Sequence, residues 1–132
     1  MNYLLDTHTL IWVFSEKEKL SSRVVNTLSE ANNAFFISAI SFWEIALKFS
    51  SGKLGIKGIL PEELPNLSLE IGFKTISLSP EESSTYNNLV RTNHKDPFDR
   101  MLIWQAIQRN LILITKDDDL NQYKSVGLKT LW

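Results

Sequence analysis

The aspartates of this chain fall in two places in the sequence, and their distribution is the first chemical feature to interpret. Asp6 stands alone, and the remaining aspartates are Asp96, Asp99 and the run 117–119. Carboxylates that meet without a basic partner raise one another's pKa unless a cation compensates their charge. If the fold brings the two places together, these acids would suit a hard divalent cation such as Mg²⁺ or Mn²⁺, which prefers oxygen ligands.

Glu44 is a further acid, and the sequence leaves two interpretations open for it. It stands between Trp43 and Ile45 in a strongly apolar segment, so it could be buried and join the same cluster. It also precedes Lys48 by four residues, so the two side chains could instead form an ion pair along one helix face. The sequence alone favours neither interpretation.

Such a cluster indicates phosphate chemistry. A divalent cation held by carboxylates can lower the pKa of a bound water and neutralise charge on a phosphate, as in many nucleases and phosphatases. Arg100 and Lys116 each adjoin an acid, and His8 follows Asp6 by two residues, so these side chains could contact a phosphate or orient a water. Each of them is more commonly a surface or helix-start residue. His94 precedes a proline loop and is given no catalytic part.

The composition excludes several other kinds of site. The chain has 132 residues and no cysteine, which excludes a disulfide framework, a cysteine-ligated metal and a thiol nucleophile. Neither a glycine-rich phosphate loop nor a nucleophile-elbow motif occurs in it. The net charge of −1 is unlike that of a strongly basic nucleic-acid-binding domain. A polyanionic partner must therefore be held by a local patch or through a metal.

Segments typical of strands alternate with segments typical of helices. The expected strands are 3–5, 34–38, 74–78, 111–115 and 126–132, and the expected helices begin near residues 7, 22, 41, 65, 80 and 98. This alternation predicts one α/β domain over residues 1–132 with a parallel sheet. Asp6 and Asp117 would follow strands at the carboxyl edge of that sheet, where ligands collect, and Asp99 would lie in the first turn of a helix facing the same crevice.

Two further expectations concern the surroundings of the chain and the packing of one helix. No apolar run approaches the ~18–20 residues that a membrane span needs, and the N-terminus has no basic or long apolar region typical of a signal peptide. We therefore expect a soluble, cytoplasmic protein that makes no contact with a membrane. The helix of residues 41–51 is apolar over most of its circumference, so we expect it to be buried on more than one side.

Four motifs, taken in their order and spacing, resemble those of a known family over essentially the whole chain. The motifs are Leu4-Leu5-Asp6-Thr7-His8, Ser41-Phe42-Trp43-Glu44-Ile45, His94-Lys95-Asp96-Pro97-Phe98-Asp99-Arg100-Met101-Leu102-Ile103 and Leu113-Ile114-Thr115-Lys116-Asp117. They resemble the PIN-domain ribonucleases, and most closely the VapC toxins of prokaryotic type II toxin–antitoxin pairs. The resemblance implies a three-layer α/β/α fold with a short, mostly parallel sheet.

The resemblance also implies a Mg²⁺-dependent endoribonuclease in which Mn²⁺ can substitute. Its four catalytic acids would be Asp6, Glu44, Asp99 and Asp117, with Asp6 and Asp99 as direct metal ligands. Asp119 is the alternative fourth acid, because three aspartates stand in a row. Asp96 would shape the turn before the helix rather than bind the metal.

Other positions would contact the substrate or a partner. The side chains expected to contact RNA are those of Thr7, His8, Arg100 and Lys116. The alternative role of Arg100 is to anchor a neighbouring carboxylate. The family further implies a transfer RNA or another structured RNA as substrate, a VapB-like antitoxin as protein partner, and a homodimer paired through helices, which would account for the apolar helix 41–51.

Two rival functions are kept open. One is a non-catalytic PIN-like binding module in which the acids have structural roles. The other is a different metal-dependent phosphate hydrolase, such as a phosphatase with an aspartate nucleophile. That class begins on an Asp-x-Asp motif, and Asp6-Thr7-His8 lacks its second acid.

Overall fold

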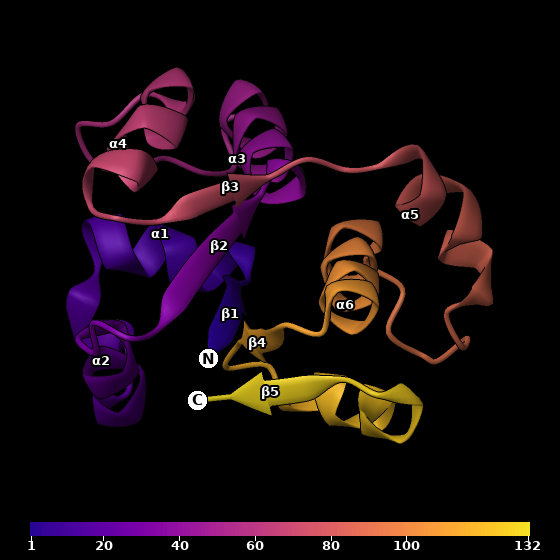
Figure 1. The fold of residues 1–132 in the computed structure, drawn as a ribbon. Coiled ribbons are helices and arrows are strands. Elements are labelled where there is room, and N and C mark those ends of the chain that lie inside the picture. The colour runs from indigo at the N-terminus through magenta and orange to yellow at the C-terminus, as the bar shows by residue number, and fades with distance from the viewer.

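The computed structural model describes all 132 residues and has a five-stranded sheet at its centre (Figure 1). The strands are β1 (Asn2–Leu5), β2 (Ala34–Ser38), β3 (Lys74–Ile76), β4 (Ile112–Ile114) and β5 (Lys129–Leu131). They are ordered β3-β2-β1-β4-β5, and every neighbouring pair is parallel. In the central strand, Leu4 pairs with Phe36 on one side and with Leu113 on the other. The predicted α/β class is confirmed, with a sheet that is wholly rather than mostly parallel.

Helices cover both faces of this sheet. They are α1 (Thr7–Ser15), α2 (Ser22–Leu28), α3 (Ala39–Ser50), α4 (Leu64–Glu70), α5 (Pro80–Thr85) and α6 (Pro97–Arg109), with 3₁₀ segments η1 (Lys17–Lys19), η2 (Pro61–Glu63), η3 (Tyr86–Asn88) and η4 (Asp118–Val126). Tyr3 and Leu5 pack into one apolar cluster with α1, α2 and α4, whereas Leu4 packs into a second cluster with α6 and η4. Successive residues of a strand point to opposite faces, so β1 is buried on both sides. None of the helices combines the length and the apolar character needed to cross a membrane.

Two strand-to-helix junctions are tight, and each places a polar side chain at the carboxyl edge of the sheet. Asp6 directly follows β1 and caps the N-terminus of α1. Ser38 ends β2 and caps α3, and its hydroxyl accepts a hydrogen bond from the Ile40 amide at 3.1 Å. Asp96 caps α6 in the same way. A short polar side chain at this position satisfies amides that the helix itself leaves unpaired, so the chain can turn from strand to helix without a loop.

Some boundaries differ from those expected from the sequence. Helix α2 ends at Leu28, and beyond its last turn the Asn33 side chain donates to the Thr27 carbonyl. The third and fourth strands are shorter than the apolar runs that predicted them. The polar stretch after β4 forms the 3₁₀ segment η4.

The expectation that α3 is buried on more than one side is wrong. Trp43 is 60% exposed, Leu47 48% and Phe49 41%, whereas Ile40 and Ile45 are buried. Helix α3 packs against α1, α6 and η2, and these neighbours leave one apolar face of the helix open to solvent. A large apolar face of this kind commonly marks an interaction surface.

Candidate active site

Asp6 lies buried at the junction of β1 and α1. Its Oδ1 accepts hydrogen bonds from the Thr9 amide at 2.8 Å and from the Thr9 hydroxyl at 2.7 Å, and its residue is only 9% exposed. Burial raises the pKa of the Asp6 carboxyl above its ordinary value, although hydrogen bonds from Thr115 and Thr9 oppose the rise. The ionised carboxylate is therefore short of compensating charge.

Glu44 combines the two interpretations that the sequence left open. Its Oε2 forms an ion pair with Lys48, one turn further along α3. The residue is nevertheless only 2% exposed, and its Oε1 is buried without a hydrogen-bond partner. An unpartnered buried carboxylate oxygen is costly and calls for a ligand.

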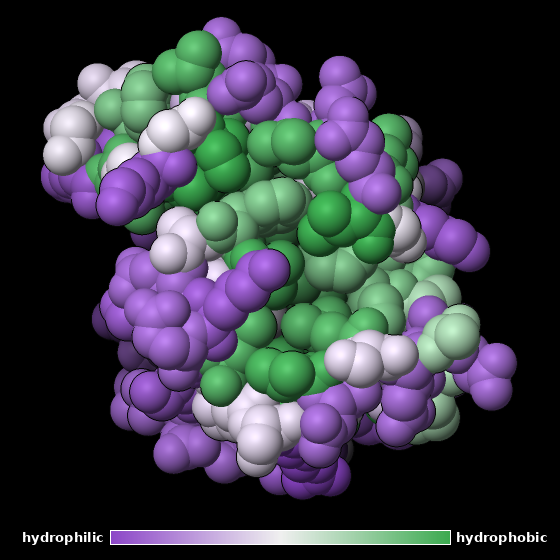
Figure 2. Space-filling model, turned by 90° about the vertical axis from the view of Figure 1, so that its left-hand side faces the viewer, coloured by the Kyte–Doolittle hydropathy of each residue, from purple (hydrophilic) through white to green (hydrophobic).

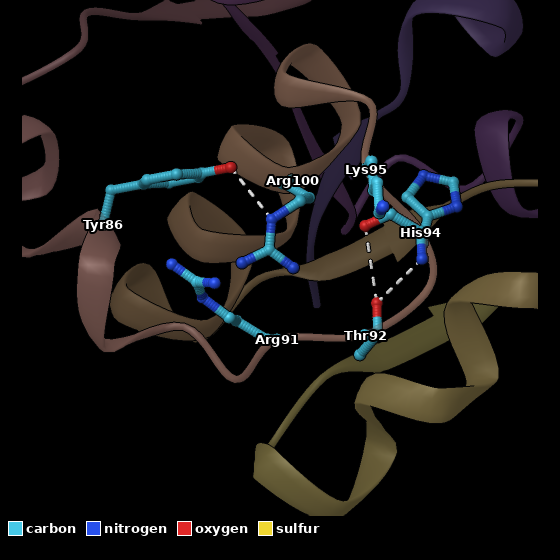
Figure 3. A pocket seen from close by; sticks show the side chains of 6 residues that line it. All are labelled: Tyr86, Arg91, Thr92, His94, Lys95 and Arg100. Atoms are coloured by element: carbon cyan, nitrogen blue, oxygen red, sulfur yellow. Dashed lines mark hydrogen bonds between the residues drawn. The ribbon is translucent and has the colours of Figure 1, made fainter.

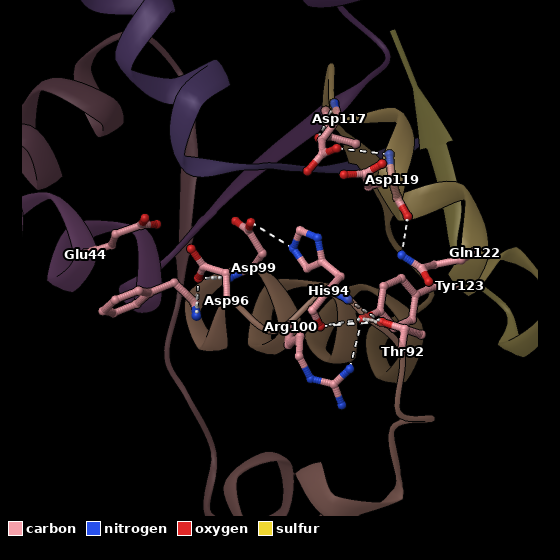
Figure 4. Close-up of polar contacts among 12 residues, drawn as sticks. Glu44, Thr92, His94, Asp96, Asp99, Arg100, Asp117, Asp119, Gln122 and Tyr123 are labelled. Atoms are coloured by element: carbon pink, nitrogen blue, oxygen red, sulfur yellow. Dashed lines mark hydrogen bonds and ion pairs between the residues drawn. The ribbon is translucent and has the colours of Figure 1, made fainter.

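Asp99 lies in the first turn of α6 and faces Glu44 and His94 (Figure 4). Its Oδ2 is 3.1 Å from His94 Nε2. Burial, together with the negative charges of Asp96 and Glu44, raises the pKa of the Asp99 carboxyl to about 6, and the hydrogen bond from His94 only partly opposes this rise. Asp96 itself caps the helix, and its Oδ1 accepts from the amides of Phe98 and Asp99, in the turn-shaping role expected for it.

Asp117 joins the two halves of the cluster. Together with Asp6 it lines a pocket of about 440 Å³, whose wall also includes His8, Trp12, Lys116 and Asp118. Its carboxylate, that of Asp119 and a ring nitrogen of His94 also lie within 4.8 Å of one another (Figure 4). Asp117 Oδ1 accepts from the Asp119 amide at 3.0 Å. The structure thus places Asp117 in one pocket with Asp6 and, together with Asp119, beside His94.

The structure therefore gathers the predicted acids into one region. Asp6 and Asp117 line the same pocket, and His94 lies between Asp117 and Asp99. The negative charge of Glu44 contributes to the raised pKa of Asp99. The sequence assigns His94 no catalytic part, whereas the structure places its ring against Asp99. Its position just before the Asp96 cap was the available signal, because a side chain there can fold back onto the first turn of α6.

These residues fit a hard divalent cation. The acids Asp6, Glu44, Asp99 and Asp117 offer carboxylate oxygens and no sulfur, which is the ligand chemistry that Mg²⁺ or Mn²⁺ prefers. Glu44 Oε1 has no hydrogen-bond partner, and burial raises the pKa of both Asp6 and Asp99, so ionised carboxylates at this site lack sufficient stabilising contacts from the protein. A bound cation would supply that stabilisation.

Two of the four side chains expected to contact RNA are buried in the structure. The Thr7 hydroxyl is buried and donates to Ser41 at 3.0 Å, so it joins α1 to α3. Arg100 is also buried and contacts no carboxylate. His8 and Lys116, in contrast, are exposed at the rim of the pocket that Asp6 and Asp117 line.

Arg100 is instead the centre of a network that holds the segment before α6. Its guanidinium donates to the hydroxyls of Tyr86 at 2.9 Å and Tyr123 at 2.8 Å, and to the carbonyls of Leu89 and Val90. The Tyr123 hydroxyl bonds Thr92 at 2.7 Å, and Thr92 Oγ1 accepts from the His94 amide at 3.1 Å. The network, here called the Arg100 network, ends at the residue that contacts Asp99.

Comparison with known proteins places the chain in a family. The model of the PIN-domain family matches residues 3–126. This chain belongs to the PIN-domain family. A curated relative of this PIN domain, ribonuclease VapC22 of Mycobacterium tuberculosis, is 26% identical over 129 residues, which cover 98% of this chain and 97% of the relative.

Solved structures share the fold of this PIN domain. The structure of VapBC2 from Rickettsia felis, bound to a DNA fragment of its promoter, matches with a TM-score of 0.68 and 21% identity, covering 100% of this chain and 99% of that one. VapBC-1 from nontypeable Haemophilus influenzae matches with a TM-score of 0.70 and 17% identity, covering 99% and 97%. The predicted three-layer PIN-like fold is thereby confirmed.

Proposed function

We propose that this PIN domain is a metal-dependent endoribonuclease that hydrolyses RNA phosphodiester bonds. The observation that carries the proposal is the gathering of Asp6, Glu44, Asp99 and Asp117 at one edge of the sheet, with a buried Glu44 oxygen that lacks a partner. The relative that covers the whole chain is named a ribonuclease, in agreement with this chemistry.

Each acid has a distinct part in the proposal. Asp6 and Asp99 would hold Mg²⁺, or Mn²⁺ in its place, and Glu44 and Asp117 would complete the negative wall of the site. When bound, the cation supplies a water of lowered pKa and neutralises charge on the phosphate. His94 fixes the Asp99 carboxylate through its ring nitrogen, and His8 and Lys116 stand at the rim, where a phosphate can be contacted.

Cleavage of total RNA by the purified protein tests the proposal. We expect cleavage with added Mg²⁺ or Mn²⁺, and a loss of at least about a hundredfold in Asp6→Asn and in Asp99→Asn, because each removes a charge that the cation needs. Glu18→Gln is the control, since Glu18 is an exposed acid in η1, outside the site. Cleavage that survives both chelation and these two substitutions would refute the proposal.

The substrate is proposed to be a transfer RNA or another structured RNA of the cytoplasm. This finer proposal is supported by the motif resemblance to VapC toxins. Sequencing the new 5′ ends that appear in cellular RNA after expression of the protein, but not after expression of Asp99→Asn, identifies the cleaved RNA. New ends spread over unstructured messenger RNA would contradict it.

We also propose a VapB-like antitoxin as the protein partner. The solved structures that share the fold include VapBC complexes. Figure 2 shows apolar side chains gathered in a hollow on the side of the molecule where α1, α2 and α4 lie in Figure 1. A groove of about 320 Å³ occurs there, lined by Val13, Lys17, Leu20, Val25, Leu28, Ser29, Ile71 and Phe73.

Growth arrest tests this partner. We expect expression of the chain to arrest growth, and expression together with the adjacent open reading frame to restore it. Val25→Asp and Ile71→Asp place a charge on half-exposed positions of the groove, so they should keep the toxicity and lose the neutralisation. Full neutralisation of both variants would place the partner elsewhere on the surface.

A further inference from the structure

A pocket with positively charged and no negatively charged side chains in its lining lies beside the acidic cluster. It has a volume of about 300 Å³ and is lined by Tyr86, Arg91, Thr92, His94, Lys95 and Arg100 (Figure 3). No carboxylate lines it. It is called the cationic pocket below.

The arginine and lysine side chains of this pocket form no ion pairs with acids of the chain. Arg91 and Lys95 are exposed, and neither forms an ion pair with an acid of the chain. Figure 3 shows the Arg91 side chain directed toward that of Arg100, on the same side as Tyr86. Like charges that face one another repel, and an anion between them converts that repulsion into attraction. The cationic pocket is therefore suited to an anionic group.

The pocket is also firmly built. The Arg100 network fixes its inner wall, because that guanidinium donates to Tyr86, Tyr123 and two backbone carbonyls. The Thr92 hydroxyl accepts from the His94 amide and so holds the loop that carries Lys95. A pocket wall that is already in place loses little entropy when a ligand binds against it.

His94 lies between the cationic pocket and the acidic cluster and belongs to the lining of the pocket. Its Nε2 contacts Asp99 on one side, and the same residue lines the pocket on the other. An RNA strand carries a phosphate at every nucleotide, so a strand whose cleaved phosphate lies at the acidic cluster must place other phosphates nearby. A guanidinium binds a phosphate through two parallel hydrogen bonds, which favours an arginine-lined pocket for one of them.

We infer that the cationic pocket binds a second phosphate of the RNA, close along the strand to the one that is cleaved. The inference rests on the ribonuclease function proposed above. Arg91 and Lys95 contact this phosphate, and Tyr86 offers an aromatic face to the adjoining base. The pocket thereby sets which linkage of a bound strand reaches the acids.

The test replaces the phosphates of a short RNA one at a time. The RNA contains one cleavage site, and each other linkage in turn is made an uncharged methylphosphonate. We expect a single linkage at which the substitution raises KM about tenfold in the wild type, while kcat changes little. In the double variant Arg91→Gln/Lys95→Gln, KM for unmodified RNA should rise by a similar factor, and the methylphosphonate at that linkage should have no further effect.

A matched control separates the pocket from net charge. Arg23→Gln/Lys57→Gln removes two exposed positive charges on α2 and in the loop after α3, outside the pocket, so it should keep the sensitivity of the linkage. The salt dependence should also differ, because removing phosphate contacts flattens the slope of log KM against log salt by about 1. The control should leave that slope closer to the wild-type value.

Binding of the same RNAs in an Asp99→Asn background, followed by fluorescence anisotropy, separates failure of the inference from failure of the ribonuclease proposal. If the wild type cleaves RNA and no linkage is sensitive, or the sensitivity persists in the double variant, the pocket does not bind a phosphate. If the wild type does not cleave and the linkage effect appears in binding, the ribonuclease proposal fails and the pocket stands. A double variant that binds and cleaves RNA normally but escapes a neutralising protein would overturn the inference and assign the pocket to an acidic partner.

Discussion

The surroundings of Asp99 make the stability of the protein depend on pH. The Asp99 pKa of about 6 in the folded protein lies above the ordinary value of 3.8. A raised pKa means that the folded state binds the proton more tightly, so this stabilisation is complete below about pH 4 and is lost as the pH rises through 6. Without a divalent cation, the ionised Asp99 therefore lowers the free energy of unfolding at neutral pH.

The first prediction is that Asp99→Asn stabilises the metal-free protein at pH 8 by about 2 kcal/mol and changes stability little near pH 4. A shift of one pKa unit corresponds to about 1.4 kcal/mol, and the partial exposure of this side chain reduces the total. Urea denaturation in the presence of a chelator at the two pH values measures it. Equal destabilisation at both values would contradict the assignment of the raised pKa.

The second prediction is that Mg²⁺ reverses this order of stability. A ligand that binds only the folded state raises its free energy of unfolding, and the increase is about 2.7 kcal/mol at a hundred times Kd. We expect Mg²⁺ or Mn²⁺ to raise the Tm of the wild type at pH 8 and to have far less effect on Asp99→Asn. An equal rise in both proteins would place the cation at another site.

Single residues also show how far the sequence could predict this site. Asp6, Asp99 and Asp117 were recognisable because each follows a strand or begins a helix, and a parallel sheet brings such positions to one edge. The part of His94 was not predictable in the same way, because its contact with Asp99 depends on the path of the loop before α6. The role of Arg100 was not predictable from the sequence, since its partners come from two segments far apart in the chain, residues 86–90 and η4.

At the scale of elements, Tyr123 joins η4 to the loop before α6. Its hydroxyl accepts from Arg100 and bonds Thr92, and the residue is fully buried. The third prediction is that Tyr123→Phe lowers the free energy of unfolding by about 1–2 kcal/mol, because it leaves Arg100 and Thr92 with one partner fewer.

Tyr123→Phe should also lower kcat for RNA cleavage, even where the variant is fully folded, because the loop that carries His94 loses the hydrogen bonds that hold it. The measurement is kcat at a temperature where the variant is fully folded. Tyr3→Phe is the control, since Tyr3 is also buried but its hydroxyl makes no hydrogen bond with the protein. If both variants keep full activity, the hydrogen bonds of the Tyr123 hydroxyl have no part in the site.

Helices α5 and α6 are joined by an ion pair between Glu82 and Arg109. Burial alone would raise the pKa of Glu82, but hydrogen bonds from Arg109, the Ser79 amide and Gln105 lower it to about 2. The two Arg109 contacts are 2.7 and 2.9 Å long. A lowered pKa stabilises the folded state above about pH 4.5, and this contribution is lost as the pH falls toward 2.

The fourth prediction is that Glu82→Gln lowers the free energy of unfolding by about 2 kcal/mol at pH 7 and by much less near pH 2.5, because the substitution breaks the ion pair between the buried Glu82 and the partly exposed Arg109. Denaturation with urea at the two pH values measures it. Glu81→Gln is the matched control on the same helix, since Glu81 is exposed and forms no ion pair. The same loss at both pH values would show that the charge of Glu82 is not what stabilises this contact.

The sequence predicted the elements better than their surroundings. The Ser79-Pro80-Glu81-Glu82 start of α5 and the Asp96 cap of α6 are local features, so the sequence shows them directly, and the structure contains both. The solvent-facing side of α3 is set by which helices pack on it, and the residues of α3 do not encode that choice. An apolar helix in sequence is therefore compatible with burial in the core or with an interface between chains.

At the scale of the whole molecule, the exposed face of α3 is proposed as the contact between two copies of the chain. Trp43, Leu47 and Phe49 form this face, and Trp43 packs edge-on against Phe98 with ring centroids 5.1 Å apart. Phe98 and Trp43 adjoin Asp99 and Glu44 in sequence, so a dimer formed here would lie beside the acidic cluster. Beside Trp43 and Phe98 there is a hollow of about 190 Å³ whose lining is almost wholly apolar.

The fifth prediction is that Leu47→Glu converts a dimer of this PIN domain into a monomer. In a two-fold symmetric contact each substitution acts twice, and burying an unpaired charge is costly, so the dimer dissociation constant should rise at least about a hundredfold. Sedimentation equilibrium at micromolar concentration measures it.

Val126→Glu is the control, because Val126 is also an exposed apolar residue but lies in η4. Leu47 is about half exposed in the monomer, so the free energy of unfolding of the monomer should change little. If Leu47→Glu and the wild type sediment with the same mass, the apolar face of α3 does not pair two copies of the chain.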